Sequence, residues 1–82
     1  MFFEFDSFID FIKEITRYKS TLRIFETLAL DQDTIQIRAI SQTQKNTYYF
    51  EDIFDAKQAQ RIINQLYDLG FVKARSIKMW EG

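Results

Sequence analysis

The chain contains no histidine, no cysteine and no proline, and its two glycines are Gly70 and Gly82. Without histidine and cysteine it forms no zinc finger, disulfide framework, thiol nucleophile or histidine general base. Two glycines are too few for a glycine-rich phosphate loop. The scarcity of proline and glycine also predicts short turns and no flexible linker. We therefore expect a protein that is not an enzyme and that binds no cofactor.

The length and the net charge of the chain exclude further classes of protein. The 82 residues are 46% hydrophobic, enough for one packed domain, and the formal net charge of −1 argues against a broad nucleic-acid-binding surface. Residues 1–55 hold ten acids and six bases, whereas residues 56–82 hold two acids and five bases. No apolar run approaches the ~18 residues that span a bilayer, and the first residues lack the basic start of a signal peptide. These features predict a single compact domain over residues 1–82, cytoplasmic and without membrane contact.

Two helices are predicted from apolar spacing. Over residues 7–19, apolar side chains recur every three to four positions after the capping residue Ser7, and their face is about 180° wide. The second helix covers residues 56–69. It begins after the N-cap Asp55 and ends at Gly70, which supplies the left-handed position, with Phe71 packing back on the last turn.

The remaining segments predict strands. Short polar turns at residues 31–33 and 43–46 separate three runs rich in β-branched and aromatic side chains, which indicates an antiparallel meander. The runs cover residues 22–30, 34–42 and 47–51, and a last strand is expected over residues 72–79. The order α-β-β-β-α-β predicts an α+β two-layer sandwich, with an antiparallel sheet and two helices on one face. If residues 2–5 add an N-terminal strand, the arrangement becomes a ferredoxin-like variant.

Aromatic residues are the strongest feature of the sequence. Nine Phe, four Tyr and one Trp occur in 82 residues, and five of the Phe fall within the first eleven positions. Monomers seldom leave large apolar patches exposed, and aromatic side chains dominate the energetics of interfaces. We therefore predict a protein-binding surface on the N-terminal segment and the first helix. Its aromatic residues are Phe2, Phe3, Phe5, Phe8 and Phe11, and its acidic rim is Glu4, Asp6, Asp10 and Glu14.

This surface leads to the primary functional hypothesis. The chain is expected to be a small non-catalytic protein-binding module that acts by steric docking on a larger protein, with a homodimer as the expected form. Acidic residues around aromatic ones suit a partner with a basic surface, such as the groove of a nucleic-acid-handling enzyme. An inhibitor of the phage or mobile-element type fits this size and composition.

The sequence is also compatible with two other functions. A nucleic-acid-binding module would use the sheet face and the basic last strand, since aromatic and basic side chains on a sheet stack and hold unpaired bases. Its residues would be Arg38, Tyr48, Tyr49, Lys73, Arg75 and Lys78. Protection of an edge strand from aggregation is the favoured explanation of the basic residues in the last strand. The second alternative is an enzyme with a carboxylate metal site at Asp31 and Asp33, or at Glu51 and Asp52. Asp31 and Asp33 are more typical of a hairpin turn and no loop of suitable ligand spacing surrounds Glu51 and Asp52, so no metal ligand is predicted.

Overall fold

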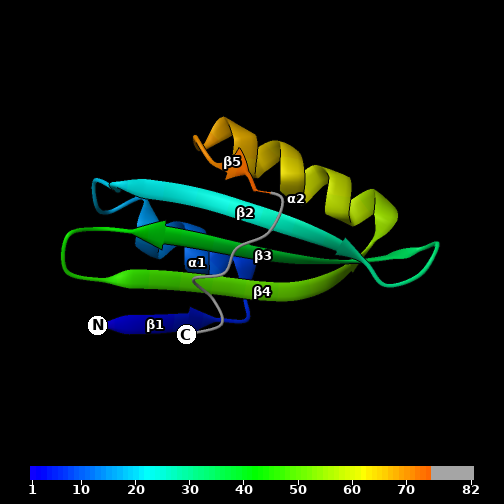
Figure 1. The fold of residues 1–82 in the computed structure, drawn as a ribbon, viewed down its shortest axis with the longest axis horizontal. Helices are drawn as coiled ribbons and strands as arrows, with labels where there is room; N and C mark the ends of the chain where they lie inside the picture. The colour runs from blue at the N-terminus through cyan, green and yellow to red at the C-terminus, as the bar shows by residue number, and fades with distance from the viewer. Residues whose placement is uncertain (75–82) are drawn as a thin grey trace.

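A computed structural model describes residues 1–74 of the chain, and its element order is β-α-β-β-β-α-β (Figure 1). The five strands form one mixed sheet in the order β1-β4-β3-β2-β5. The α+β class is confirmed, and so is the extra N-terminal strand. Residues 75–79 of the predicted last strand lie outside the described part. The elements are β1 (Phe2–Phe5), α1 (Phe8–Ile15), β2 (Leu22–Ala29), β3 (Thr34–Gln42), β4 (Thr47–Asp55), α2 (Ala56–Asp68) and β5 (Val72–Lys73).

The prediction of a wholly antiparallel sheet is wrong for the two outer strands. Strands β2, β3 and β4 form the expected antiparallel meander, but β1 runs parallel to β4 and β5 runs parallel to β2. The reason is the helix that joins each outer strand to the meander. A helix packed on a sheet returns the chain to the end at which the preceding strand began, so the following strand repeats its direction. The element order with three strands between the helices matches the predicted variant and has one strand more than a ferredoxin-like fold, but the mixed sheet order differs from the predicted arrangement.

The first helix ends earlier than its apolar pattern predicts, at Ile15 instead of residue 19. The hydroxyl of Thr16 donates to the carbonyls of Ile12 (2.9 Å) and Lys13 (3.2 Å), and the N–H of Tyr18 donates to Ile15 in a tighter turn. Such local bonds end a helix because they use the carbonyls that the next turn would need. Its start follows the prediction, since Ser7 accepts from the N–H of Asp10.

The second helix has the predicted caps. The carboxylate of Asp55 accepts from the N–H of Gln58 at 2.8 Å, and Gly70 has a φ of 87°. The N–H of Phe71 donates to Leu66 and that of Gly70 donates to the carbonyl of Tyr67, each at 3.0 Å. This is the Schellman arrangement, in which a left-handed glycine lets the chain turn back over the last helical carbonyls.

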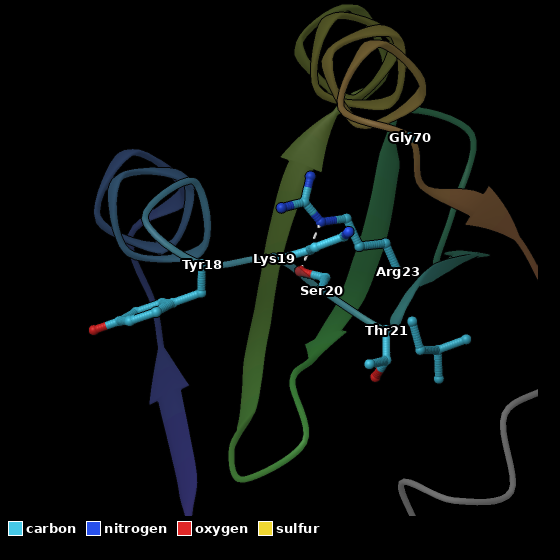
Figure 2. A pocket seen from close by; sticks show the side chains of 7 residues that line it. Tyr18, Lys19, Ser20, Thr21, Arg23 and Gly70 are labelled. Carbon is cyan, nitrogen blue, oxygen red and sulfur yellow. Dashed lines mark hydrogen bonds between the residues drawn. The ribbon is translucent and has the colours of Figure 1, made fainter.

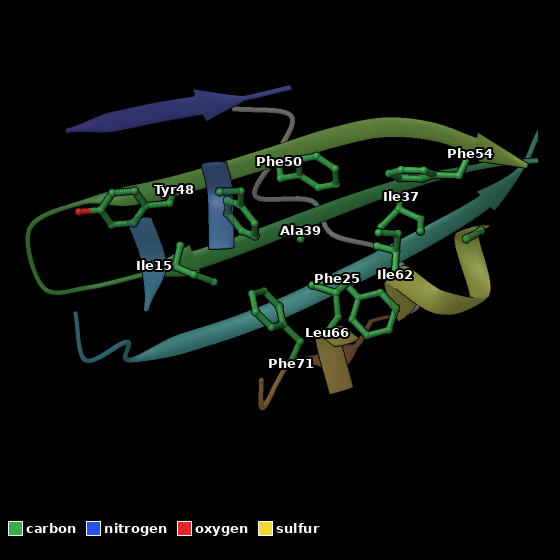
Figure 3. Packing of buried hydrophobic residues seen from close by; sticks show 12 residues of the cluster. Ile15, Phe25, Ile37, Ala39, Tyr48, Phe50, Phe54, Ile62, Leu66 and Phe71 are labelled. Carbon is green, nitrogen blue, oxygen red and sulfur yellow. The ribbon is translucent and has the colours of Figure 1, made fainter. Parts of the chain in front are cut away.

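Both helices pack on the same face of the sheet. The register Phe25–Ala39–Phe50 places these three residues on one face of β2, β3 and β4. Figure 3 shows them in contact with side chains from both helices, which closes one hydrophobic core. The buried residues are Phe11 and Ile15 of α1, Phe25, Ile37, Ala39, Tyr48, Phe50 and Phe54 of the sheet, Ala59, Ile62 and Leu66 of α2, and Phe71.

Candidate functional site

Strand β1 divides its phenylalanines between the two faces of the sheet. Because side chains alternate along a strand, Phe3 and Phe5 lie on the helix-covered face and Phe2 lies on the opposite face, together with Glu4. The ring of Phe3 stacks on Tyr48 with centroids 5.4 Å apart, and the ring of Phe2 stacks on Tyr49 at 5.9 Å. The predicted aromatic surface is therefore split into two parts.

Only part of the predicted aromatic set is accessible. Phe2 is 57% exposed and Phe3 is 37% exposed, whereas Phe5 and Phe8 are half-buried against the core. Phe11 is 0% exposed, so its assignment to a binding surface is corrected: it is a core residue. The wide apolar face of α1 explains the difference, since most of it packs against β4 and β1.

Two exposed apolar residues near this site were not among the predicted contact residues. Ile9 on α1 is 66% exposed, and Tyr18 is exposed where the chain leaves α1. The ring of Tyr18 stacks on that of Tyr48 with centroids 5.9 Å apart, so the rings of Tyr18 and Phe3 both stack on Tyr48. Ile9 and Tyr18 both fall within the apolar half of the predicted helical wheel. This pattern identifies the apolar face of a helix, but it does not tell which residues of that face are buried in the core.

Carboxylates surround the Phe2 side of β1. Glu4 and Asp6 line a hollow of about 340 Å³ together with Phe5, Tyr49 and Glu51. Of the other two predicted rim residues, Asp10 is exposed on α1, and Glu14 forms an ion pair with Arg17 at 3.4 Å. Exposed carboxylates therefore lie on β1, directly after it and at the start of α1.

A row of charged residues crosses the sheet next to this hollow. Glu26, Arg38 and Glu51 are direct neighbours in the register of β2, β3 and β4. The guanidinium of Arg38 lies 3.3 Å from a carboxylate oxygen of each glutamate. Because two acids flank one base, this row adds negative charge to the face that carries Phe2.

The hydroxyl of Tyr49 donates to the carboxylate of Glu51. Burial raises the pKa of Tyr49 well above its usual value, and the bond to Glu51 and its negative charge raise it further. When the pKa of a group is higher in the folded protein than in the unfolded chain, the resulting stability is complete below the unfolded-state pKa, near 10 for tyrosine. That stability is lost as the pH rises through the folded-state pKa.

We therefore expect the free energy of unfolding to fall above pH ~10, and Tyr49→Phe to reduce that fall in urea unfolding at a series of pH values. Glu51→Gln is the companion variant, and it should lower the pKa of Tyr49; an unchanged pH dependence in both variants would contradict this assignment.

The residues of the alternative nucleic-acid surface are not brought together. Tyr48 and Tyr49 point to opposite faces, and Tyr48 is buried. Arg38 is paired with two carboxylates, and Lys73 lies on β5, at the opposite edge of the sheet from β1. The other two predicted residues, Arg75 and Lys78, lie outside the described residues. No aromatic and basic platform is therefore visible in residues 1–74.

A second hollow, of about 420 Å³, lies where both helices end (Figure 2). Arg23 of β2 reaches into this region, and its guanidinium donates to the carbonyls of Ile15 and Leu69 and to the hydroxyl of Ser20. These bonds tie the ends of α1 and α2 to the sheet, so Arg23 has a structural role. Sequence reasoning gave Arg23 no role, because its partners are distant in the chain. The lining residues are Tyr18, Lys19, Ser20, Thr21, Leu22, Arg23 and Gly70.

Three of the four carboxylates considered as metal ligands have structural partners. Asp31 accepts from the N–H of Asp33 at 2.8 Å, a bond that lowers the pKa of Asp31. Asp52 accepts from the N–H of Ile53 at 2.8 Å, and Glu51 accepts from the hydroxyl of Tyr49 and pairs with Arg38. Within residues 1–74, no three potential ligand side chains gather where they could hold a metal ion. Neither α1 nor α2, the helices of this part of the chain, has the length and apolarity needed to cross a bilayer.

The candidate contact residues form what we call the N-terminal edge: Phe2, Phe3 and Glu4 of β1, which are exposed, with the half-buried Tyr49 and Glu51 of the neighbouring strand β4. It combines exposed, stacked aromatic rings with carboxylates at one side of the sheet. Comparison of the chain with protein-family models, with curated proteins and with solved structures finds no match in any of the three. The N-terminal edge is therefore interpreted from its own chemistry.

Proposed function

We propose that the chain is a non-catalytic protein-binding module and that the N-terminal edge is its contact surface. The observation that supports this is the exposure of Phe2 and Phe3, 57% and 37%, although both rings are stacked on tyrosines. Stacked rings lose little conformational freedom on binding, and burying them removes apolar surface from water. Rigid aromatic side chains of this kind are the usual anchors of protein interfaces.

The carboxylates of the N-terminal edge favour a partner with a basic surface. Glu4, Asp6 and Glu51 line one hollow beside the Phe2–Tyr49 stack, and opposite charge across an interface speeds association and selects the partner. The groove of a nucleic-acid-handling enzyme has this chemistry, and a module docked there would block it sterically. The proposal includes self-association, because an exposed sheet edge accepts a second copy as well as a different chain.

The proposed contact surface is tested by comparing two exposed apolar residues, one in the N-terminal edge and one at the opposite edge of the sheet. Phe2 and Val72 are 57% and 61% exposed and lie on the same face of the sheet, but at opposite edges. In quantitative capture from a lysate of the source cells, Phe2→Ser is expected to reduce retention of the partner at least tenfold, a loss of ~1.4 kcal/mol or more. Val72→Ser should retain the partner like the unaltered chain.

Two further measurements complete the test. Circular dichroism and thermal melting establish that both variants remain folded. Retention of a basic partner should also fall with added salt, because salt screens exposed charges beyond ~10 Å at 0.1 M. Equal retention by the Phe2→Ser and Val72→Ser variants would refute the N-terminal edge as the contact surface.

A further inference from the structure

Within residues 1–74, the outer side of β1 has no neighbouring strand. The N–H of Thr47 donates to the carbonyl of Met1 at 2.8 Å, so Met1 directs its backbone groups toward β4. Because this direction alternates along a strand, Phe3 and Phe5 also face β4, while the N–H and C=O of Phe2 and Glu4 face outward. Strand β1 is terminal in the sheet order, and no described strand lies beyond it. Such an edge is a template for another strand.

We propose that a second copy of the chain occupies this edge, with its β1 antiparallel to the first β1 across a two-fold axis at Phe3. The inference rests on the proposed function, since it uses the same N-terminal edge and names one occupant of it. Two identical surfaces that meet across a two-fold axis form a closed dimer. The product is one continuous sheet that extends through both copies.

The register follows from the outward groups. With Phe3 opposite Phe3 of the second copy, Phe2 pairs with Glu4 of the second copy and Glu4 with its Phe2, so every outward N–H and C=O of β1 is bonded. A shift in one direction places the two Glu4 carboxylates directly opposite each other, which is unfavourable. A shift in the other direction places Glu4 beyond β1 of the second copy, so its outward backbone groups gain no partner within that strand. The pairing centred on Phe3 avoids both defects.

Charge at the two ends of β1 favours an antiparallel second copy. At the start of β1, the ammonium of Met1 donates to the carbonyl of Lys45, and Lys45 shares a hollow of about 610 Å³ with Lys19. At the other end follow Asp6 and Asp10, both exposed. Antiparallel pairing brings the basic end of one copy beside the acidic end of the other, whereas parallel pairing brings like charges together.

The proposed dimer does not use the sheet face that carries Phe2. Phe3 lies on the helix-covered side of β1, so the two Phe3 rings meet there, while Phe2 and Tyr49 of each copy remain on the opposite face. A larger partner can therefore bind across both copies. Pairing of two four-residue strands buries a small area, whereas stable complexes bury about 1,200–2,000 Å² in total. We therefore expect a dimer that dissociates on dilution.

Single cysteines test the register, because the chain has none of its own. Phe3 is at a non-hydrogen-bonded antiparallel position, where Cα atoms are ~4.5 Å apart and within the range that a disulfide spans. Under mild oxidation, Phe3→Cys is expected to form a covalent dimer at least tenfold faster than Phe2→Cys or Val72→Cys. The Phe2 positions lie diagonally, beyond ~7 Å, and Val72 lies at the far edge. Phe2→Cys mixed with Glu4→Cys should cross-link as the Phe3 variant does.

Light scattering tests the assembly without cysteine. The molar mass of the unaltered chain is expected to rise from 9.9 kDa toward twice that value with increasing concentration. Glu4→Pro removes an outward N–H and no bond to β4, so this variant should stay folded by circular dichroism and remain a monomer. A constant monomer mass up to millimolar concentration, or equal cross-linking of the Phe2 and Phe3 variants, would overturn the second copy as occupant.

The two proposals fail in different ways. A monomer that loses its captured partner on Phe2→Ser overturns the second-copy occupant and supports the docking surface. A dimer with the Phe3 register whose capture is unaffected by Phe2→Ser supports the second-copy occupant and refutes docking of a larger protein through Phe2.

Discussion

Replacing Phe11 with alanine is expected to destabilise the fold by about 3–5 kcal/mol, the usual cost of removing a buried phenylalanine ring. The ring of Phe11 is fully buried and lies 5.6 Å from that of Phe50, 5.8 Å from Phe5 and 6.1 Å from Phe71, between centroids. Removing it therefore opens a cavity where α1, β1, β4 and the segment after α2 meet. A small domain with a total stability of about 5–15 kcal/mol loses a large share of it.

Phe2→Ala is the matched control for this prediction. Phe2 belongs to the same aromatic segment, but it is more than half exposed and its ring stacks on Tyr49 alone among the described residues. Its removal should cost less than about 1 kcal/mol. Urea unfolding followed by circular dichroism measures both free energies. Similar losses for the two variants would show that Phe11 does not hold the core together.

The difference in burial between Phe11 and Phe2 could not be predicted from the sequence pattern alone. Periodicity identifies the apolar face of α1, but it does not tell whether that face meets the protein's own sheet or a partner. The answer depends on β1, whose four residues are too few to show a strand alternation. Once β1 pairs with β4, α1 packs over both strands and Phe11 becomes part of the core.

Elements defined by neighbouring residues were predicted well. Asp55 and Gly70 set the ends of α2 through bonds within a few positions, and the turn before β3 forms around the bond from Asp33 to Asp31. In each case the side chain and its backbone partner are close in the chain, so the residue type itself carries the information. The boundaries of α2 and of the β2–β3 turn accordingly agree with the structure.

Strand β2 shows why burial was harder to predict. Its alternating pattern groups Leu22, Ile24 and Leu28 on one face, yet the fully buried residue is Phe25 on the other. The ring of Phe25 packs edge-on against Tyr67 of α2, with centroids 5.3 Å apart. Contact with a distant helix decides which face of a strand is buried, and a single strand does not contain that information.

Arg23 illustrates the same limit for a charged residue. Its guanidinium donates to the carbonyl of Leu69 at 2.7 Å and to that of Ile15 at 3.2 Å, and it lies over the ring of Phe71 at 5.7 Å. The last carbonyls of a helix lack partners within the helix and carry partial negative charge, so a cation stabilises them. One side chain thus joins the ends of two helices that are separated in sequence by the whole meander.

We expect Arg23→Met to destabilise the fold by about 3 kcal/mol, because hydrogen bonds to charged groups contribute about 1.5–3 kcal/mol each and their loss leaves carbonyls without donors. Arg23→Lys should recover part of this loss, since one ammonium cannot reproduce the planar fork that reaches both helix ends. Arg17→Met is the control: its ion pair with Glu14 is exposed, and its loss should cost less than about 1 kcal/mol. Urea unfolding measures the loss of unfolding free energy for each variant. Equal losses for the Arg17 and Arg23 variants would show that Arg23 does not join the helix ends. A loss specific to Arg23 would instead show that bonds from one side chain to the ends of α1 and α2 stabilise the whole fold.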